Sequence, residues 1–406
     1  MGTDQKIMMW FVLAVCAFGQ TASVEQRTRE VLDLWVAGRY GEIHSQFDSK
    51  MKELTVATFR QQSEQLKALG PMSRAGEPVV LSSGGFRTVL MRLEFPSTVL
   101  QFSVSWSERG EIAGLWFKPD AWNAPSYSNA DAFTSVEVTI GTDKWKLPGT
   151  LTIPKSTGPF PAVVLVHGSG PNDRDESIGG SKIFKDLAHG LASRGIAVLR
   201  YAKRTKVYPK DWAKDASPTM TTETVEDALR AAALLRRYEG IDASRVFVLG
   251  HSQGGYMMPR VMQRDSKLAG VIVMAGNVRP LEELIVEQMA YLGVPAQKDV
   301  LGSLHLPPQY LADLSGYRPD AEAKKVDMPM LILQGERDYQ VTMKDFALWH
   351  AALGERANVV FHSYPNLNHL FIAGEGKSLP AEYARPGHLD RQVVEDIADW
   401  VRARGI

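Results

Sequence analysis

Cysteine is nearly missing from this sequence: Cys16 is the only one in 406 residues. It lies in an N-terminal segment that we expect to be removed, so the mature chain would hold none. Such a chain has no disulfide, no cysteine metal ligand and no thiol nucleophile. Its stability has to come from a packed hydrophobic core, which a chain of this length is able to bury.

The chain also has no net charge, because 46 Lys and Arg residues balance 46 Asp and Glu residues. No excess of either sign points to nucleic acid or to an anionic membrane surface as a partner. The densest basic run has five members, and we expect it to be a solvated loop rather than a polyanion site. These members are Arg200, Lys203, Arg204, Lys206 and Lys210.

An apolar run long enough to cross a bilayer is also lacking at the N-terminus. The run Ile7 to Phe18 (IMMWFVLAVCAF) follows Lys6 and has the length of a signal-peptide core. We therefore expect residues 1–22 to be a signal peptide and the protein to be exported (periplasmic or secreted), without stable membrane insertion after cleavage. Residues 13–16 approach a lipoprotein box, but Val15 is bulky where a small residue is expected. Lipid anchoring through Cys16 is the less favoured alternative.

Residues 23–118 predict a small α+β domain. Helical periodicity comes first, and short alternating segments typical of an antiparallel meander follow it. The predicted helices are 24–38 and 58–69, and the predicted strands are 78–81, 87–95, 99–106 and 112–117. Residues 119–133 are rich in Pro, Asn, Ser and Asp, and we predict them to be the linker.

Residues 134–406 predict a second domain, of the α/β class. Apolar strands alternate with helices over this length, which indicates a mostly parallel sheet flanked by helices on both sides. The predicted strands are 135–140, 151–153, 162–166, 196–201, 246–249, 270–274, 330–333 and 359–364.

One insertion, at about residues 277–327, interrupts this alternation. It holds a predicted helix over 280–292 and then proline-rich loop and turn signals, with no strong strand. Ligands of open α/β sheets bind at the carboxyl ends of the strands, so we predict that the insertion is a helical lid or pocket wall. A peripheral helical addition is the alternative.

The motif Gly250-His-Ser-Gln-Gly254 predicts a nucleophile elbow, because it follows a predicted buried strand and precedes a helix start. The turn at such an elbow is so sharp that the residues two before and two after the serine must be small. Ser252 is therefore the predicted nucleophile. The backbone N–H of Gln253, at the start of the helix, is one predicted donor to an oxyanion.

The second oxyanion donor is expected in the loop after strand 162–166. That loop reads His167-Gly-Ser-Gly-Pro171, and the N–H of Ser169 is the predicted donor. The loop lacks both the third glycine of a dinucleotide site and the Gly-Lys-Ser/Thr of a P-loop, which argues against phosphate binding.

The acid and the base should follow the serine in that order. Asp338 comes just after strand 330–333 and His369 just after strand 359–364, so the predicted triad is Ser252, Asp338 and His369. Glu336 is a rival for the acid. We expect no metal or organic cofactor, because His-Glu-x-x-His is absent and the histidines do not cluster at ligand spacing.

Four other histidines of this domain are not expected to be the base. His362 lies inside a predicted strand and His388 falls too late in the chain. His167 and His251 are expected to support the turns in which they lie.

Taken together, these motifs resemble those of α/β-hydrolases. They are most similar to a bacterial exported esterase family within the dienelactone-hydrolase and prolyl-oligopeptidase-like group. The resemblance rests on residues 166–175 (VHGSGPNDRD), 250–254 (GHSQG), 334–338 (QGERD) and 367–370 (LNHL). It implies carboxylesterase activity on small to medium acyl esters. It also implies an N-terminal domain similar to the cone-shaped nuclear transport factor fold, for which residues 23–118 carry no sharp motif.

Ala202 departs from the pattern of that family, in which an aspartate that supports a turn is expected at this position. Tyr310, Tyr317 and Met257 are candidate pocket residues, although side chains of these types more often serve packing.

Two other functions compete with the esterase. A serine peptidase of the oligopeptidase-like group would need a group for the peptide's N-terminus. The pair Glu282-Glu283 could supply it, but a solvated helix face is expected there. A non-catalytic binding role is disfavoured for residues 134–406 by the triad. A binding role remains an alternative for the N-terminal domain, which would then form a homodimer contact or cover the pocket.

Overall fold

The computed structural model describes residues 22–67, 69–95, 99–119, 122–141, 144–215, 218–295, 300–304 and 306–404. The chain divides into two compact units with a boundary between Lys118 and Pro119. The predicted signal peptide, apart from Ala22, lies outside the described residues, and so does Cys16. Within the described ranges no helix has both the length and the apolar character needed to cross a membrane.

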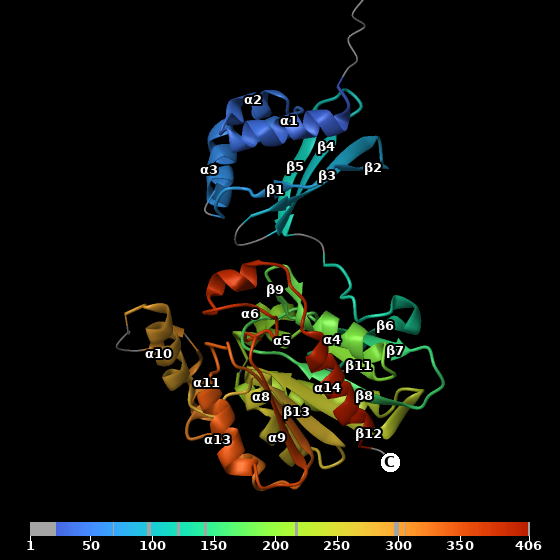
Figure 1. Ribbon diagram of the computed structural model, residues 1–406, viewed down its shortest axis with the longest axis vertical. Coiled ribbons are helices and arrows are strands. Elements are labelled where there is room, and N and C mark those ends of the chain that lie inside the picture. Colours follow the sequence, from blue (N-terminus) through green and yellow to red (C-terminus); the bar gives the residue numbers. More distant parts are fainter. Residues whose placement is uncertain are drawn as a thin grey trace, which may run out of the picture. The chain divides into compact units, whose positions relative to one another are not determined.

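The first unit packs helices against an antiparallel sheet (Figure 1). Its helices are α1 (Val24–Val36), α2 (Tyr40–Ser45) and α3 (Val56–Lys67), with a 3-10 turn at Met51–Glu53. Its strands are β1 (Arg74–Ala75), β2 (Val79–Ser83), β3 (Phe86–Glu94), β4 (Val99–Trp106) and β5 (Ile112–Pro119). Ser23 caps α1 by accepting a hydrogen bond from the N–H of Gln26. Helix α1 buries Val31, Leu32 and Trp35 in the core that it shares with the sheet.

An eight-stranded sheet is the centre of the second unit, in the order β15-β14-β13-β12-β8-β11-β7-β6. The first six of these strands are parallel, and β7 runs antiparallel to both β11 and β6. Their bounds are β6 (Phe133–Ile140), β7 (Leu147–Pro154), β8 (Phe160–Val166), β11 (Ala197–Tyr201), β12 (Ile241–His251), β13 (Gly270–Met274), β14 (Met330–Gly335) and β15 (Val359–Tyr364). Two short strands, β9 (Ser177–Ile178) and β10 (Ser181–Lys182), form a separate hairpin. The mostly parallel α/β sheet predicted from the sequence is confirmed.

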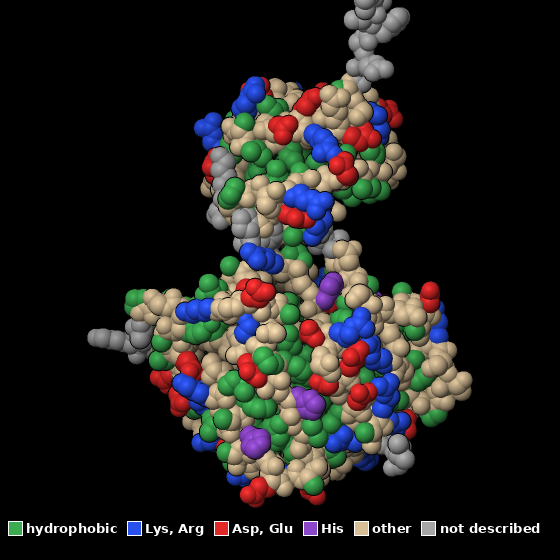
Figure 2. All heavy atoms as spheres, in the orientation of Figure 1, with side chains coloured by type: hydrophobic (Ala, Val, Ile, Leu, Met, Phe, Trp, Pro, Cys, Tyr) green, Lys and Arg blue, Asp and Glu red, His purple; other side chains and the backbone are tan. Residues whose placement is uncertain are grey.

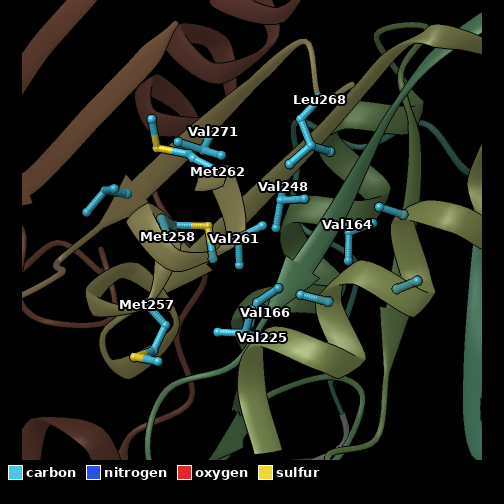
Figure 3. Close-up of a cluster of buried hydrophobic side chains, with 14 of the residues drawn as sticks. Val164, Val166, Val225, Val248, Met257, Met258, Val261, Met262, Leu268 and Val271 are labelled. Carbon is cyan, nitrogen blue, oxygen red and sulfur yellow. The ribbon is translucent and has the colours of Figure 1, made fainter. Parts of the chain in front are cut away.

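Helices cover both faces of this sheet (Figure 1). One face packs against α4 (Ile183–Ala192) and α14 (Arg391–Arg402). The other packs against α7 (Glu226–Leu235), α9 (Met258–Arg264) and α13 (Met343–Leu353). Figure 3 shows part of this second core, a cluster of buried side chains that includes Val164 of β8, Val248 of β12 and Val261 of α9. Burial of both faces explains why the central strands are apolar at every position rather than alternating.

The topology switches direction at β8. The chain passes from β8 to β11 on one side and later returns to β12 on the other side. A crevice outside the carboxyl ends of the strands forms at such a switch point. The loops after β8 and β12, which hold Ser169 and Ser252, both open there.

The lid segment is more helical than its sequence predicts. Helix α10 (Leu281–Leu292) was expected, but the proline-rich part also forms α11 (Pro308–Leu314) and α12 (Pro319–Ala323). Proline occupies the first position of both helices, where its missing N–H costs nothing. These prolines start helices rather than mark loops.

The predicted linker packs against the second unit. Tyr127 donates a hydrogen bond from its hydroxyl to the backbone oxygen of Leu389, and Trp122 donates from its indole N–H to Asp186. A 3-10 turn (Ala130–Ala132) then leads into β6. The aromatic side chains of this segment therefore anchor it, although its composition is that of a loop.

The prediction of a solvated basic loop is wrong for three of the five basic residues in that run. Arg200, Lys203 and Arg204 are only 5%, 2% and 2% exposed. Each pairs with a buried carboxylate, on Asp175, Glu223 and Asp227 respectively. Elsewhere the charges are mixed: on the face shown in Figure 2, basic and acidic side chains lie among one another.

Candidate active site

Ser252 lies at a strained turn between β12 and the short helix α8 (Gln253–Tyr256). Its φ of 50° and ψ of −116° are unusual for a residue with a side chain and are of the kind that cluster at active sites. Its N–H donates to the oxygen of Met274 at 2.8 Å, which ties the turn to the neighbouring strand β13.

Close backbone contacts explain the glycines around Ser252. A Cβ on Gly250 would lie 2.3 Å from the carbonyl carbon of Gly254, and a Cβ on Gly254 would lie 2.3 Å from the oxygen of Val166. No side chain fits at either position. The predicted nucleophile elbow is therefore the geometry that the structure adopts.

Ser169 and Gln253 line the same cavity as Ser252. Among the described residues, no acceptor takes the backbone N–H of either Ser169 or Gln253. The N–H of Gln253 is at the first position of α8, where helical N–H groups have no partner within the helix. Both N–H groups are therefore free to donate to a group bound in the cavity.

His369 and Asp338 are joined by a hydrogen bond of 2.6 Å between Nδ1 and Oδ2. Asp338 also accepts from the N–H groups of Gln340 and Val341 on its other oxygen, so its orientation is fixed. Both side chains are buried. The rival acid Glu336 is exposed and accepts a hydrogen bond from Ser363 instead.

The ring of His369 lies next to the elbow, 4.8 Å between centroids from the ring of His251. Within the described ranges, no hydrogen bond joins Ser252 Oγ to His369 Nε2. In free serine hydrolases this contact is often long, and it tightens when substrate binds.

His362 and His388 pair with acidic residues other than Asp338. His362 pairs with Asp396 and His388 with Asp186. His167 is fully enclosed between Phe184 and Tyr201, and burial lowers its pKa to about 4. These three histidines have structural surroundings, as the sequence analysis expected.

A buried pair that the sequence analysis missed lies directly behind the elbow. His251 Nδ1 is 3.1 Å from Glu176 Oε1, and His251 Nε2 is 3.0 Å from the backbone oxygen of His369. The same Glu176 oxygen accepts the N–H of Gly168 at 2.7 Å. One ion pair thus connects the loop of Ser169, the elbow and the loop of His369. Glu176 follows the Asn172–Asp175 run, but no sequence signal pairs it with a residue 75 positions away.

The cavity that holds Ser252, which we call the active-site cavity, has a volume of about 560 Å³. The lid supplies one largely apolar wall, made by Leu281, Leu284, Ile285, Leu304, Leu306, Pro307, Tyr310 and Leu314. Pro209, Trp212 and Met220 contribute on other sides. The lid residues that line the cavity all lie within residues 277–327.

Three candidate pocket residues have different positions. Tyr310 lines the active-site cavity, whereas Tyr317 lines a second cavity of about 250 Å³ under the lid. Met257 is completely buried in the hydrophobic cluster drawn in Figure 3. It lines neither cavity. Glu282 and Glu283 are exposed on α10, and neither lines the active-site cavity.

The strand order, the strained serine after β12 and the hydrogen-bonded acid and histidine after β14 and β15 define an α/β-hydrolase. Residues 184–387, about half of the chain, match the model of the prolyl oligopeptidase family. The chain is 42% identical over 334 residues to Esterase EstD of Thermotoga maritima, a match that covers 76% of this chain and 78% of that protein. This chain therefore belongs to the prolyl oligopeptidase family and is a serine hydrolase.

Solved structures that are similar to this chain include a putative dienelactone hydrolase from Klebsiella pneumoniae, with 18% identity and a TM-score of 0.43. That match covers 67% of this chain and 99% of the other. An acylaminoacyl peptidase from Pyrococcus horikoshii has 15% identity and a TM-score of 0.49, over 80% of this chain and 56% of the other.

Proposed function

We propose that this protein is a carboxylesterase that cleaves uncharged esters of small to medium acyl chains through Ser252, His369 and Asp338. The observation that carries the proposal is the strained Ser252, which opens into an apolar cavity beside the free N–H groups of Ser169 and Gln253. The relative named as an esterase, at 42% identity, supports it.

The proposed reaction follows from the positions of these groups. Ser252 Oγ attacks the ester carbonyl carbon while its proton passes to His369 Nε2, and Asp338 holds the opposite side of the ring. The N–H groups of Ser169 and Gln253 donate to the oxyanion. His369 then protonates the leaving alcohol, and water hydrolyses the acyl-enzyme by the same steps.

The cavity favours an ester over a peptide. Among the described residues that line it, Glu223 alone carries a charge, and Lys203 neutralises this charge at 3.1 Å. A group that recognises a peptide's N-terminus would need a free carboxylate in the cavity. Glu282 and Glu283 do not meet this need, because they face solvent.

Hydrolysis of p-nitrophenyl acetate, butyrate and octanoate, compared with aminoacyl and peptidyl p-nitroanilides, tests the proposal. We expect the purified protein to cleave the esters and Ser252→Ala to cleave none. Cleavage of the anilides with little ester hydrolysis would favour the peptidase instead.

We also propose that the chain is exported after cleavage of residues 1–22, and that residues 23–118 form a homodimer contact or restrict the substrate range. N-terminal sequencing of the protein recovered from cell fractions tests the first proposal. Removal of residues 24–118, followed by measurement of solution mass and acyl preference, tests the second. An unchanged number of chains per particle together with an unchanged substrate profile would refute it.

A further inference from the structure

Both backbone polar groups of Gly168 are held by hydrogen bonds, and they belong to two successive peptide groups. Its N–H donates to Glu176 Oε1 at 2.7 Å, and its oxygen accepts from Lys203 Nζ at 2.9 Å and from Asn172 Nδ2 at 3.2 Å. A Cβ on Gly168 would lie 3.1 Å from the Cβ of Ser252, so this backbone passes directly beside the proposed nucleophile.

The oxygen of Gly168 and the N–H of Ser169 belong to the same peptide group. In a trans peptide the C=O and the N–H point in opposite directions. Donors that hold the oxygen on one side therefore direct the N–H of Ser169 to the other side, toward the cavity that Ser169 shares with Ser252. If this peptide rotated, the oxyanion would face a carbonyl oxygen instead of a donor.

Lys203 is the stronger of the two donors, because it is charged and its side chain is only 3% exposed. The ammonium group of Lys203 lies 3.1 Å from Glu223 Oε1. The backbone N–H of Lys203 donates to the backbone oxygen of Asn172. Burial alone would raise the pKa of Glu223, but the charge of Lys203 and the hydroxyls of Tyr310 and Thr205 together keep it below its usual value. Glu223 therefore stays ionised and holds Lys203 in place.

Glu223 also reaches the second oxyanion donor and the lid. Its Oε2 accepts from the hydroxyl of Tyr310 in α11 at 2.7 Å and from Gln253 Nε2 at 3.4 Å. The side chain of Gln253 donates further to Thr224 and to Tyr310, at 3.1 Å each. One buried network thus connects both residues of the proposed oxyanion hole to the lid. Glu223 lies in a single π-helical turn, Thr221–Val225, a type of turn frequent at functional sites.

We propose that Lys203, held by Glu223, is a positioning residue that orients the Gly168–Ser169 peptide so that the N–H of Ser169 faces the oxyanion. The inference rests on the proposed function, since it concerns the same oxyanion hole. Lys203 does not touch the substrate, because it reaches the reaction only through the carbonyl of Gly168.

The test replaces the ion pair by an uncharged pair of similar size, Lys203→Met with Glu223→Gln. Removal of an oxyanion donor typically lowers kcat by about 10²–10³-fold. We expect a loss of this size with KM for p-nitrophenyl butyrate changed by less than about threefold, because ground-state binding uses the apolar walls. Binding of a trifluoromethyl ketone, whose adduct with Ser252 carries the oxyanion, should weaken by a similar factor, whereas binding of the matching methyl ketone should not.

Arg204→Met with Asp227→Asn is the matched control. It removes the adjacent buried ion pair, and neither of these residues contacts Gly168 through a hydrogen bond in the described chain. We expect this control to lose stability yet to keep its kcat per folded molecule. A kcat in Lys203→Met/Glu223→Gln equal to that of the wild type, or an equal loss in the control, would overturn the inference.

If the double variant does not fold, the single variant Asn172→Ala tests the same inference. Asn172 is partly exposed and is the other donor to the same carbonyl, so we expect about a tenfold fall in kcat at unchanged KM. An unchanged kcat in that variant would overturn the inference. Failure of this inference would leave the esterase activity of the wild-type protein intact. Failure of the proposed function would appear as a wild-type protein without esterase activity.

Discussion

The imidazole of His251 donates from Nε2 to the backbone oxygen of His369 at 3.0 Å. Its other nitrogen lies 3.1 Å from Glu176 Oε1. A carbonyl and a carboxylate can only accept, so both nitrogens of His251 carry protons and the ring is an imidazolium. The residue before the proposed nucleophile is thus a buried cation that supports the loop of His369, the proposed base.

Charges around this pair decide how it titrates. Burial alone would lower the pKa of His251, but the charge and hydrogen bond of Glu176, the oxygen of His369 and the charge of Asp338 raise it above 6.5. Burial alone would raise the pKa of Glu176, whereas His251 and His167 together hold it below 4.5. The stability that His251 contributes is complete below pH 6.5 and is lost as the pH rises through its raised pKa. The contribution of Glu176 is complete above pH 4.5 and is lost as the pH falls through its lowered pKa.

Glu176→Gln should therefore lower the pKa of His251 and move the alkaline loss of stability to lower pH. We expect kcat at neutral pH to fall by about tenfold, from the loss of one charge-assisted hydrogen bond. The ¹⁵N shifts of labelled histidines and urea unfolding from pH 4 to 10 measure both effects. Wild-type protein whose His251 is neutral at pH 6 would contradict this account.

Asp338→Asn should lower kcat by about 10⁴-fold at nearly unchanged stability, because an amide holds the wrong tautomer of His369. Glu336→Gln is the matched control, since Glu336 lies two residues away and its exposed carboxylate accepts a hydrogen bond from Ser363. We expect ordinary activity from this control with p-nitrophenyl butyrate. Equal losses in the two variants would mean that the acid has been assigned wrongly.

Gly254→Ala should destabilise the second unit by ~1–3 kcal/mol, because its new methyl group would meet the oxygen of Val166 at 2.3 Å. Gly41→Ala in helix α2 is the comparison, since nothing lies within 4 Å of that position. It should leave stability unchanged or raise it by up to ~1 kcal/mol. Urea unfolding of both variants measures these changes, and a wild-type midpoint for Gly254→Ala would contradict the close contact.

Ile285→Trp should shift the substrate preference toward short acyl chains, because Ile285 lines the active-site cavity from the lid. Val286→Trp is the matched control: its side chain is 41% exposed on the same helix and does not line the cavity. We expect kcat/KM for p-nitrophenyl octanoate to fall by at least tenfold relative to acetate in the first variant alone. A shift of the same size in both variants would place the acyl chain elsewhere.

Sequence patterns predicted the parts of this molecule that depend on local chain order. Gly250 and Gly254 flank Ser252 because the backbone there has no room, and such a constraint is visible as a motif. Asp338 and His369 follow consecutive parallel strands, so their place at one edge of the sheet could be predicted as well.

Pairings between distant segments could not be predicted in this way. Lys203 looked like one of several basic residues, because its partner Glu223 and its contact with Gly168 exist only after β11 lies beside β8. His251 and Glu176 meet for the same kind of reason, across 75 positions. Local composition also misjudged Pro308 and Pro319, which start helices where turns were expected.

Covalent labelling of Ser252 tests the central claim most directly. The protein would be incubated with a fluorophosphonate, its intact mass measured and the modified peptide sequenced, with Ser252→Ala treated alongside. We predict one added phosphonyl group on Ser252, loss of p-nitrophenyl butyrate hydrolysis in proportion to labelling, and no labelling of the variant. Equal labelling of Ser252→Ala, or full hydrolysis by protein labelled at Ser252, would contradict the account.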